Sequence, residues 1–218
     1  MDALLKNLKR LQPEVDYQAL MAEMKHISHP RRKLKELQNK GYLTRVKKGF
    51  YVFSNDFIER PYSPEIVANL IYGPSYLSLE YALSFYGLIP ERVSVYTSVT
   101  SQKNKKFQTP IGAFSYSHLH SDLYPYGVGF KHQFSMENGR PFLIASPEKA
   151  VLDLFTLRMK SSAKPSMGDL QVALEDDWRI DVKSLRQMVR RDLLENMKSA
   201  YRNRPWCKLL IDFLLEDQ

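Results

Sequence analysis

The chain contains very little cysteine and no long hydrophobic run, and both absences narrow its class. One of its 218 residues is a cysteine, Cys207, so the sequence predicts neither an intramolecular disulfide nor a cysteine-based metal site. No stretch of about 18 apolar residues occurs, so no transmembrane helix is expected. The first residues, MDALLKNLKRLQPEVD, lack the apolar core of a signal peptide. Together these absences predict a cytoplasmic protein with no membrane partner.

Motifs that carry catalytic chemistry are missing as well. The sequence has neither a Gly-rich phosphate loop nor the elbow motif of a serine nucleophile. Asp153 and the run Glu175–Asp177 do not follow a Gly-Ser motif on a strand, the pattern expected for metal-dependent nucleotidyl transfer. His118 and His120 project from one face of a predicted strand, but no third ligand at suitable spacing accompanies them. We therefore expect no catalytic residues, no metal and no cofactor; an enzyme would require a metal on this histidine face.

Positive charge, by contrast, is concentrated in one short window. The whole chain has a net charge of +8, with a pI of about 9.4. Residues 26–50 contain eight basic residues and one acid, so this window carries +7 and the rest of the chain +1. A basic module joined to a nearly neutral one predicts a polyanion-binding domain followed by a domain with a different function.

The basic window follows two short helices and contains a third. Leucines at helical spacing predict a helix over Ala3–Leu11, and a second over Tyr17–Lys25 with Asp16 as its N-cap. The third is expected from His29 to Lys40, with Ser28 as N-cap and Gly41 after its end. Two strands then follow, Tyr42–Val46 and Phe50–Phe53, joined by a turn with Gly49 at a positive φ. Three helices followed by a hairpin is the order of a winged helix.

The third helix has one apolar and one polar face. At about 100° per residue, Leu34 and Leu37 fall together and should face the other helices. Arginine, lysine and asparagine on the opposite face can read base edges in the major groove, and a helix N-terminus suits a phosphate. The sequence therefore predicts DNA contacts from this helix and the hairpin at Ser28, His29, Arg31, Arg32, Lys35, Gln38, Asn39, Arg45, Lys47 and Lys48.

Two other interpretations of the basic helix stay open. A basic amphipathic helix is often only a solvated face, with Arg32 and Glu36 forming an ordinary i,i+4 ion pair. The same faces could also dock an acidic protein partner. Further along, Gln102–Lys106 reads as a solvated hairpin tip, or alternatively as a second phosphate contact.

The rest of the chain predicts a mixed α and β body. Helices are expected at Pro64–Tyr72 and Ser78–Tyr86, followed by a block of strands and then a helix capped by Ser146 with Glu148 in its first turn. The predicted strands are Val93–Thr100, Lys106–Thr109, Gly112–His120, Gly129–Ser135 and Pro141–Ala145. After a polar loop, the predicted helices are Leu170–Asp176, Val182–Asp192 and Trp206–Leu215.

Several of these segments resemble a known family. YLSLEYALSFYGLIPE, TSVT, TPIGAFSY and SPEKAVLDL occur in this order, and GYLTRVKKGFYVF precedes them. Together they resemble the AbiEi-type antitoxins, which are transcriptional regulators of AbiE abortive-infection toxin–antitoxin systems, over roughly residues 31–157. The resemblance implies an α+β protein with an N-terminal winged helix-turn-helix and a mixed α/β antitoxin domain that has an antiparallel sheet and C-terminal helices. The expected boundaries are 1–56 for the winged helix, 57–63 for a linker and 64–218 for the antitoxin domain.

The resemblance also implies a function. Such a protein binds repeats in its own promoter as double-stranded DNA and represses its operon, and a dimer on the DNA is an expected form. Its C-terminal domain neutralises a cognate nucleotidyltransferase-like toxin. DNA contact would fall on the basic residues of the third helix and on the RVKKG turn, and the family offers no catalytic residues. The alternative is a protein-binding antitoxin whose winged helix docks a protein rather than DNA.

Overall fold

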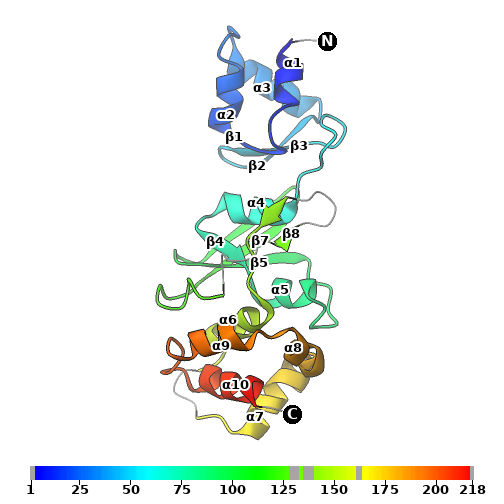
Figure 1. The fold of residues 1–218 in the computed structure, drawn as a ribbon. Coiled ribbons are helices and arrows are strands. Elements are labelled where there is room, and N and C mark those ends of the chain that lie inside the picture. Colours follow the sequence, from blue (N-terminus) through cyan, green and yellow to red (C-terminus); the bar gives the residue numbers. More distant parts are fainter. Residues whose placement is uncertain (1–2, 128–132, 135–139, 161–163, 217–218) are drawn as a thin grey trace.

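The fold has three layers stacked along the molecule (Figure 1). A computed structural model describes residues 3–127, 133–134, 140–160 and 164–216. The N-terminal helices and a small sheet form one end, a second sheet with its helices lies in the middle, and the C-terminal helices form the other end. The predicted α+β class is confirmed. No helix in the described ranges has the length and apolar character needed to cross a membrane.

The N-terminal layer has three helices and a three-stranded antiparallel sheet in the order β1-β3-β2. Its elements are α1 (Ala3–Leu8), β1 (Glu14–Asp16), α2 (Tyr17–Glu23), α3 (Pro30–Asn39), β2 (Leu43–Lys47) and β3 (Phe50–Phe53). The strand β1 was not predicted from the sequence. Val15 is buried, and the carbonyl of Pro13 accepts a hydrogen bond from the Phe53 amide, so three residues suffice to extend the sheet.

The hairpin of β2 and β3 is buried on both faces. Leu43, Tyr51 and Phe53 pack with the N-terminal helices in a small hydrophobic cluster. Val46, Phe50 and Val52 belong instead to the large hydrophobic cluster of the rest of the chain. Such two-sided burial explains why β3 reads as four consecutive apolar residues, FYVF, rather than as an alternating strand.

The segment that was expected to be a linker packs against both layers. Phe57 and Ile58 are buried in the small N-terminal cluster. The Ser63 amide donates to Glu14 Oε1 at 2.7 Å, and Arg140 pairs with the same carboxylate at 2.5 and 2.9 Å. The Glu14 side chain is fully buried, so its ion pair with Arg140 lies within the protein rather than at the solvent-exposed surface. The domain boundaries at 56 and 64 stay predictions.

The middle layer contains a four-stranded mixed sheet. Its order is β4-β5-β7-β6, and β5 runs parallel to β7 while the other pairs are antiparallel. The elements are α4 (Pro64–Ile71), β4 (Ser75–Leu77), α5 (Leu79–Phe85), β5 (Val95–Thr100), β6 (Lys105–Thr109) and β7 (Gly112–His118). The prediction of an antiparallel sheet missed the parallel pair, because the hairpin of β6 and β7 folds back so that β7, not β6, lies beside β5.

A short two-stranded sheet joins β8 (Gln133–Phe134) to β9 (Pro141–Phe142). The strand predicted at Gly129–Ser135 lies outside the described residues except for β8. The strand predicted at Pro141–Ala145 is shorter than expected, although Ile144 makes an isolated parallel bridge to Leu77.

The C-terminal layer is helical. It comprises α6 (Pro147–Arg158), α7 (Met167–Gln171), the π-helical turn η1 (Val172–Asp177), α8 (Val182–Met188), α9 (Arg191–Lys198) and α10 (Pro205–Leu215). The single helix predicted over Val182–Asp192 is wrong. The chain becomes extended at Val189 and Arg190, and a new helix starts at Arg191. This change of direction lets Leu194 and Met197 of α9 reach the core.

Candidate nucleic-acid interface

Helix α3 places its two faces as the sequence predicts. Leu34 and Leu37 are 6% and 1% exposed and pack in the small N-terminal cluster. Arg31, Arg32, Lys35 and Asn39 are exposed. We call Arg32, Lys35 and Asn39 the α3 face. In the part of the chain that the structure describes, Arg32 and Lys35 have no hydrogen-bond or ion-pair partner, so their charged groups are available to a ligand.

The expected pair between Arg32 and Glu36 is not formed. Glu36 bonds instead with Lys33 at 3.2 Å and Lys40 at 2.8 Å. Hydrogen bonds from Lys40 and then Lys33 lower the pKa of this carboxyl, so it stays ionised. Its charge is thus balanced by flanking lysines, one turn away on each side, and does not engage the arginine of the α3 face.

The start of α3 differs from the prediction by one residue. His29, not Ser28, is the N-cap, and it makes no side-chain capping bond. Pro30 occupies the first turn, where its missing N–H costs nothing, so the helix begins directly after His29. Ser28 and His29 are exposed and line a surface pocket of about 480 Å³ together with Pro30, Arg31 and Arg32. This pocket lies at a helix N-terminus and two arginines line it, a setting that suits a phosphate group.

The C-terminal part of α3 offers less than was expected. Asn39 is exposed, but Gln38 is half-buried. Gly41 follows the helix with φ of +71°, as predicted for the residue that ends it. The chain then turns directly into β2, so the helix and the hairpin are held close together.

The three basic residues of the hairpin separate into two groups. Arg45 and Lys48 are exposed, and Gly49 has the positive φ, +83°, that the turn requires. Lys47 is half-buried, and its ammonium donates a hydrogen bond to the carbonyl of Ile71 at the end of α4. It also lies 5.8 Å from the ring centroid of Phe107, and burial lowers its pKa. Lys47 thus joins the hairpin to the middle layer.

Arg45 lies on the same side of the hairpin as the N-terminal helices. The register pairs Arg45 with Tyr51, whose side chain belongs to the small N-terminal cluster. Its guanidinium Nε donates to the carbonyl of Lys47 at 3.4 Å. Of the ten residues predicted to contact DNA, Lys47 and Gln38 are the two that the structure leaves partly enclosed.

Comparison with known proteins gives a fold likeness. No family model matches the chain, and no curated protein matches it. The crystal structure of the Rv2827c protein from Mycobacterium tuberculosis is similar to it, with a TM-score of 0.51 and 14% sequence identity. The match covers 99% of this chain and 81% of that one, so it includes all three layers. At this identity the likeness shows the fold alone.

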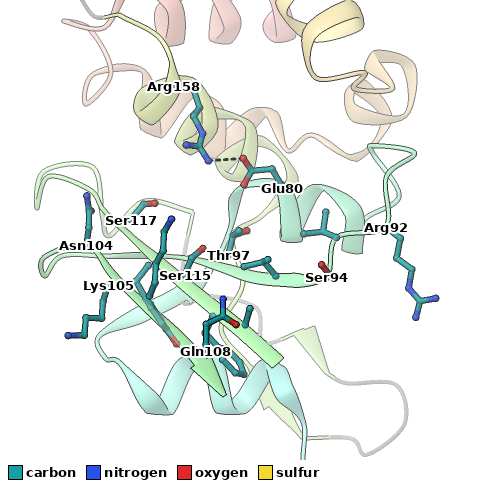
Figure 2. A pocket seen from close by; sticks show the side chains of 16 residues that line it. Glu80, Arg92, Ser94, Thr97, Asn104, Lys105, Gln108, Ser115, Ser117 and Arg158 are labelled. Atoms are coloured by element: carbon teal, nitrogen blue, oxygen red, sulfur yellow. Dashed lines mark hydrogen bonds and ion pairs between the residues drawn. The ribbon is translucent and has the colours of Figure 1, made fainter. Parts of the chain in front are cut away.

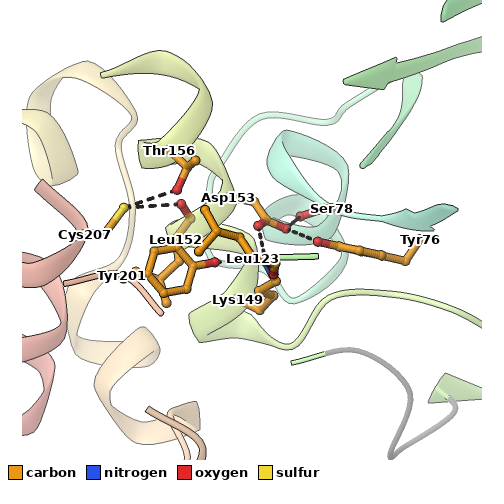
Figure 3. Close-up of polar contacts among 9 residues, drawn as sticks. All are labelled: Tyr76, Ser78, Leu123, Lys149, Leu152, Asp153, Thr156, Tyr201 and Cys207. Carbon is orange, nitrogen blue, oxygen red and sulfur yellow. Dashed lines mark hydrogen bonds and ion pairs between the residues drawn. The ribbon is translucent and has the colours of Figure 1, made fainter. Parts of the chain in front are cut away.

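A second group of polar side chains, which was not predicted from the sequence, forms a buried cluster (Figure 3). Lys149 and Asp153 of α6 form an ion pair of 2.5 Å with both side chains fully buried. Asp153 accepts hydrogen bonds from Tyr76 at 2.9 Å and Ser78 at 2.8 Å, and Lys149 donates to Tyr201 at 2.9 Å. Burial, with the nearby Asp153 charge, raises the pKa of both tyrosines well above the usual value. The i,i+4 spacing within SPEKAVLDL was the available signal.

This cluster is sealed rather than open to a substrate. Lys149 also donates to the carbonyl of Leu123 at 3.0 Å, so its donors are satisfied inside the protein. Cys207 lies nearby with its sulfur 3.3 Å from Thr156 Oγ1, and burial raises the pKa of its thiol to about 11. Such a thiol is an inert core group.

The other candidate ligands do not come together. His118 ends β7 and its ring nitrogen bonds with the carbonyl of Gln102, whereas His120 lies beyond the strand and pairs with Asp122. Across the described residues, no group of three or more His, Cys, Asp or Glu side chains could hold a metal ion. Asp153 is in the buried cluster, and Glu175–Asp177 are exposed on η1.

Proposed function

We propose that this chain is a bacterial DNA-binding transcriptional repressor and the antitoxin of an AbiE-like toxin–antitoxin system. The observation that carries the DNA-binding half is the α3 face, whose Arg32 and Lys35 are exposed and have no partner among the residues that the structure describes. It lies in a window of 25 residues that holds nearly all of the net positive charge. The proposal requires no catalytic residue, metal or cofactor.

The proposed contacts divide by chemistry. Arg32, Lys35 and Asn39 have the side chains that bond guanine or adenine edges when a helix lies in the major groove. Arg45 and Lys48 on the hairpin, and the pocket at Ser28 and His29, would bind phosphates and so fix the register on the duplex. Lys47 would support the position of the hairpin rather than contact DNA, because its ammonium donates a hydrogen bond to the carbonyl of Ile71.

The antitoxin half rests on the resemblance of residues 31–157 to AbiEi-type antitoxins. The expected partners are promoter repeats, bound by a possible dimer, and a nucleotidyltransferase-like toxin. The fold likeness to Rv2827c extends over the whole chain and is compatible with a two-part protein, but it supports the fold and not the activity.

The DNA half is tested by measuring the binding of labelled duplex from the chain's own upstream region and of a scrambled duplex. Arg32→Ala and Lys35→Ala should each weaken the specific duplex by about 10- to 100-fold and reduce the preference for it. Lys48→Ala should weaken both duplexes alike and lower the slope of log affinity against log salt by about 1. Lys208→Ala, an exposed lysine on α10, is the matched control.

No shift of either duplex at low salt would rule out DNA binding. Equal losses for the specific and scrambled duplexes in all three variants would leave only non-specific binding. For the antitoxin half, co-expression with the product of the adjacent gene should relieve growth arrest, and absence of a toxic neighbour would contradict it.

The alternative function, a module that docks a protein, has one observation in its favour. One face of the hairpin, through Val46, Phe50 and Val52, already packs against another part of the protein. A hairpin used in this way is not a free wing, so only Arg45 and Lys48 of its basic residues remain exposed to a partner. Stable co-purification with the neighbouring gene product, without DNA and unaffected by nuclease, would favour this function if the duplexes show no shift.

A further inference from the structure

A second basic surface lies on the middle sheet, apart from α3 (Figure 2). One face of β5, β6 and β7 is left open beside α5 and the end of α6, and it forms a groove of about 830 Å³. We call it the sheet groove. Its floor includes Ala113, Ser115 and Ser117 of β7, which alternate along the strand. The intervening residues, Phe114 and Tyr116, are 1% and 2% exposed and face the core.

The floor is made of small side chains, so another backbone can come close to it. Lys106 of β6 pairs in register with Ser115, and Thr97 of β5 pairs with Ser115 on the other side. The side chains across the groove are thus lysine, serine and threonine at strand spacing. The hydroxyl of Ser115 has no hydrogen-bond partner among the described residues, which leaves it available to a ligand.

The rim of the groove is positively charged. Arg92, Lys105, Lys106 and Arg158 line it, and Glu80 is the acidic residue among its lining side chains. Glu80 pairs with Arg158 at 2.9 Å, so its charge is already balanced. Arg92 and Lys106 are exposed and form no ion pair within the described residues. Lys105 pairs in register with the core-facing Tyr116 and lies 5.9 Å from the centroid of the Phe107 ring, so its side chain projects from the other face of the sheet. An occupant of this groove should therefore be an anion with several charges.

We propose that the sheet groove binds an extended acidic segment of a partner protein. An extended segment can lie along the small side chains of the floor, where its carboxylates would meet the exposed Arg92 and Lys106. The groove also lacks what a single-stranded nucleic acid needs, because the rings of Phe114 and Tyr116 are buried and cannot stack on bases. The proposal does not depend on DNA binding by the α3 face.

The test uses an N-acetylated octaglutamate peptide and the full chain labelled with ¹⁵N. Because the α3 face could also attract this peptide, the readout has to be resolved by residue. We expect amide shifts at Ser115, Ser117 and Lys106 during the titration. An octathymidylate titrated in parallel should shift these amides less at the same charge concentration.

The matched variants are Lys106→Glu, in the groove, and Lys208→Glu as an exposed-lysine control. The groove variant should weaken the peptide's effect on Ser115 and Ser117 by about tenfold or more, whereas Lys208→Glu should leave it within about twofold. A pentaglycine-serine peptide should cause no shift. Shifts confined to α3, or equal shifts with octathymidylate, would overturn the proposal, as would loss of binding in the Lys208→Glu control.

Discussion

Two lysine–carboxylate pairs with the same i,i+4 spacing have opposite environments in this molecule. Glu36 and Lys40 lie at the surface of α3, with side chains 42% and 54% exposed. Lys149 and Asp153 lie on α6 with no exposure at all. Spacing alone predicts the ion pair in both helices but not its role. The surface pair stays hydrated and screened, whereas the buried pair must be fully matched by hydrogen bonds because water does not reach it.

The difference explains how basic residues are used in the two regions. On α3 the flanking lysines neutralise Glu36 and leave Arg32 and Lys35 free to bind a ligand. On α6 the single lysine is fully engaged by Asp153, Tyr201 and the carbonyl of Leu123. On α3, Arg32 and Lys35 are therefore suited to binding a ligand. On α6, the pair of Lys149 and Asp153 holds the helix against the sheet, because Asp153 accepts hydrogen bonds from Tyr76 and Ser78.

The largest expected effect is on the buried pair. Asp153→Ala should lower the free energy of unfolding by about 3–5 kcal/mol, because it leaves the Lys149 ammonium buried without its counter-charge. The double variant Lys149→Met with Asp153→Leu should lose less than the single variant, since no uncompensated charge remains. Urea denaturation followed by circular dichroism measures both. A loss within error of zero for Asp153→Ala would show that the cluster is not structural.

A smaller effect is expected at the junction of the layers. Lys47→Met keeps the aliphatic stem but removes the bond to the Ile71 carbonyl, so it should cost about 1 kcal/mol of stability. Lys48→Met, its exposed neighbour, should leave stability unchanged. In the DNA assay the order should reverse, with Lys48→Met reducing the salt slope more than Lys47→Met. Equal effects of the two substitutions in both assays would contradict a structural role for Lys47 and a DNA-binding role for Lys48.

Glu148 provides a pH test of burial. Its side chain is fully buried beside the Arg190 guanidinium, at 3.7 Å, and burial raises its pKa above the ordinary 4.5. Because the folded protein then holds the proton more tightly than the unfolded chain, stability should fall as pH rises from about 4.5 through the raised pKa. Glu148→Gln should remove this decline. Urea midpoints from pH 4 to 7 for the two proteins measure it, and parallel curves would argue against the raised pKa.

The smallest effect is expected at the surface pair. Glu36→Gln should leave the urea midpoint nearly unchanged, because Glu36 and Lys40 are largely exposed and Lys33 is only partly buried, so their bonds compete with water. The same variant should raise affinity for any duplex, since it removes the acid closest to the α3 face. A large loss of stability would mean that this pair is structural after all.

Much of the N-terminal layer could be predicted because its signals are local. Gly41, Gly49 and the Leu34–Leu37 stripe each depend only on neighbouring residues, and each is found as expected. The strand β1 and the second buried face of the hairpin could not be predicted, because both depend on partners far along the chain. The bond from Lys47 to Ile71 is of the same kind: the basic turn looks the same in the sequence whether its lysines meet solvent or another helix.

In the second half of the chain, the sequence motifs predicted the helices but not the hydrogen bonds between them. SPEKAVLDL predicts a helix, and α6 is found there. That Asp153 meets Tyr76 and Ser78 follows only once α6 is packed on the sheet. The break at Val189 was also missed, because Val182, Leu185 and Val189 keep a helical spacing up to the break. The groove on β5–β7 could not be predicted for a similar reason. Gln102–Lys106 was predicted to be a hairpin tip, and only the pairing of Lys105 and Lys106 with β7 shows that the strand begins there.

The small N-terminal sheet has no free face, and this constrains how the protein could sit on DNA. With Leu43, Tyr51 and Phe53 on one side and Val46, Phe50 and Val52 on the other, the sheet cannot swing about the junction without opening a hydrophobic core. Two copies bound to a repeated operator would then be spaced by the rigid dimensions of the whole chain rather than by the reach of a tether. We expect such a protein to tolerate base changes between its half-sites far better than the insertion of half a helical turn.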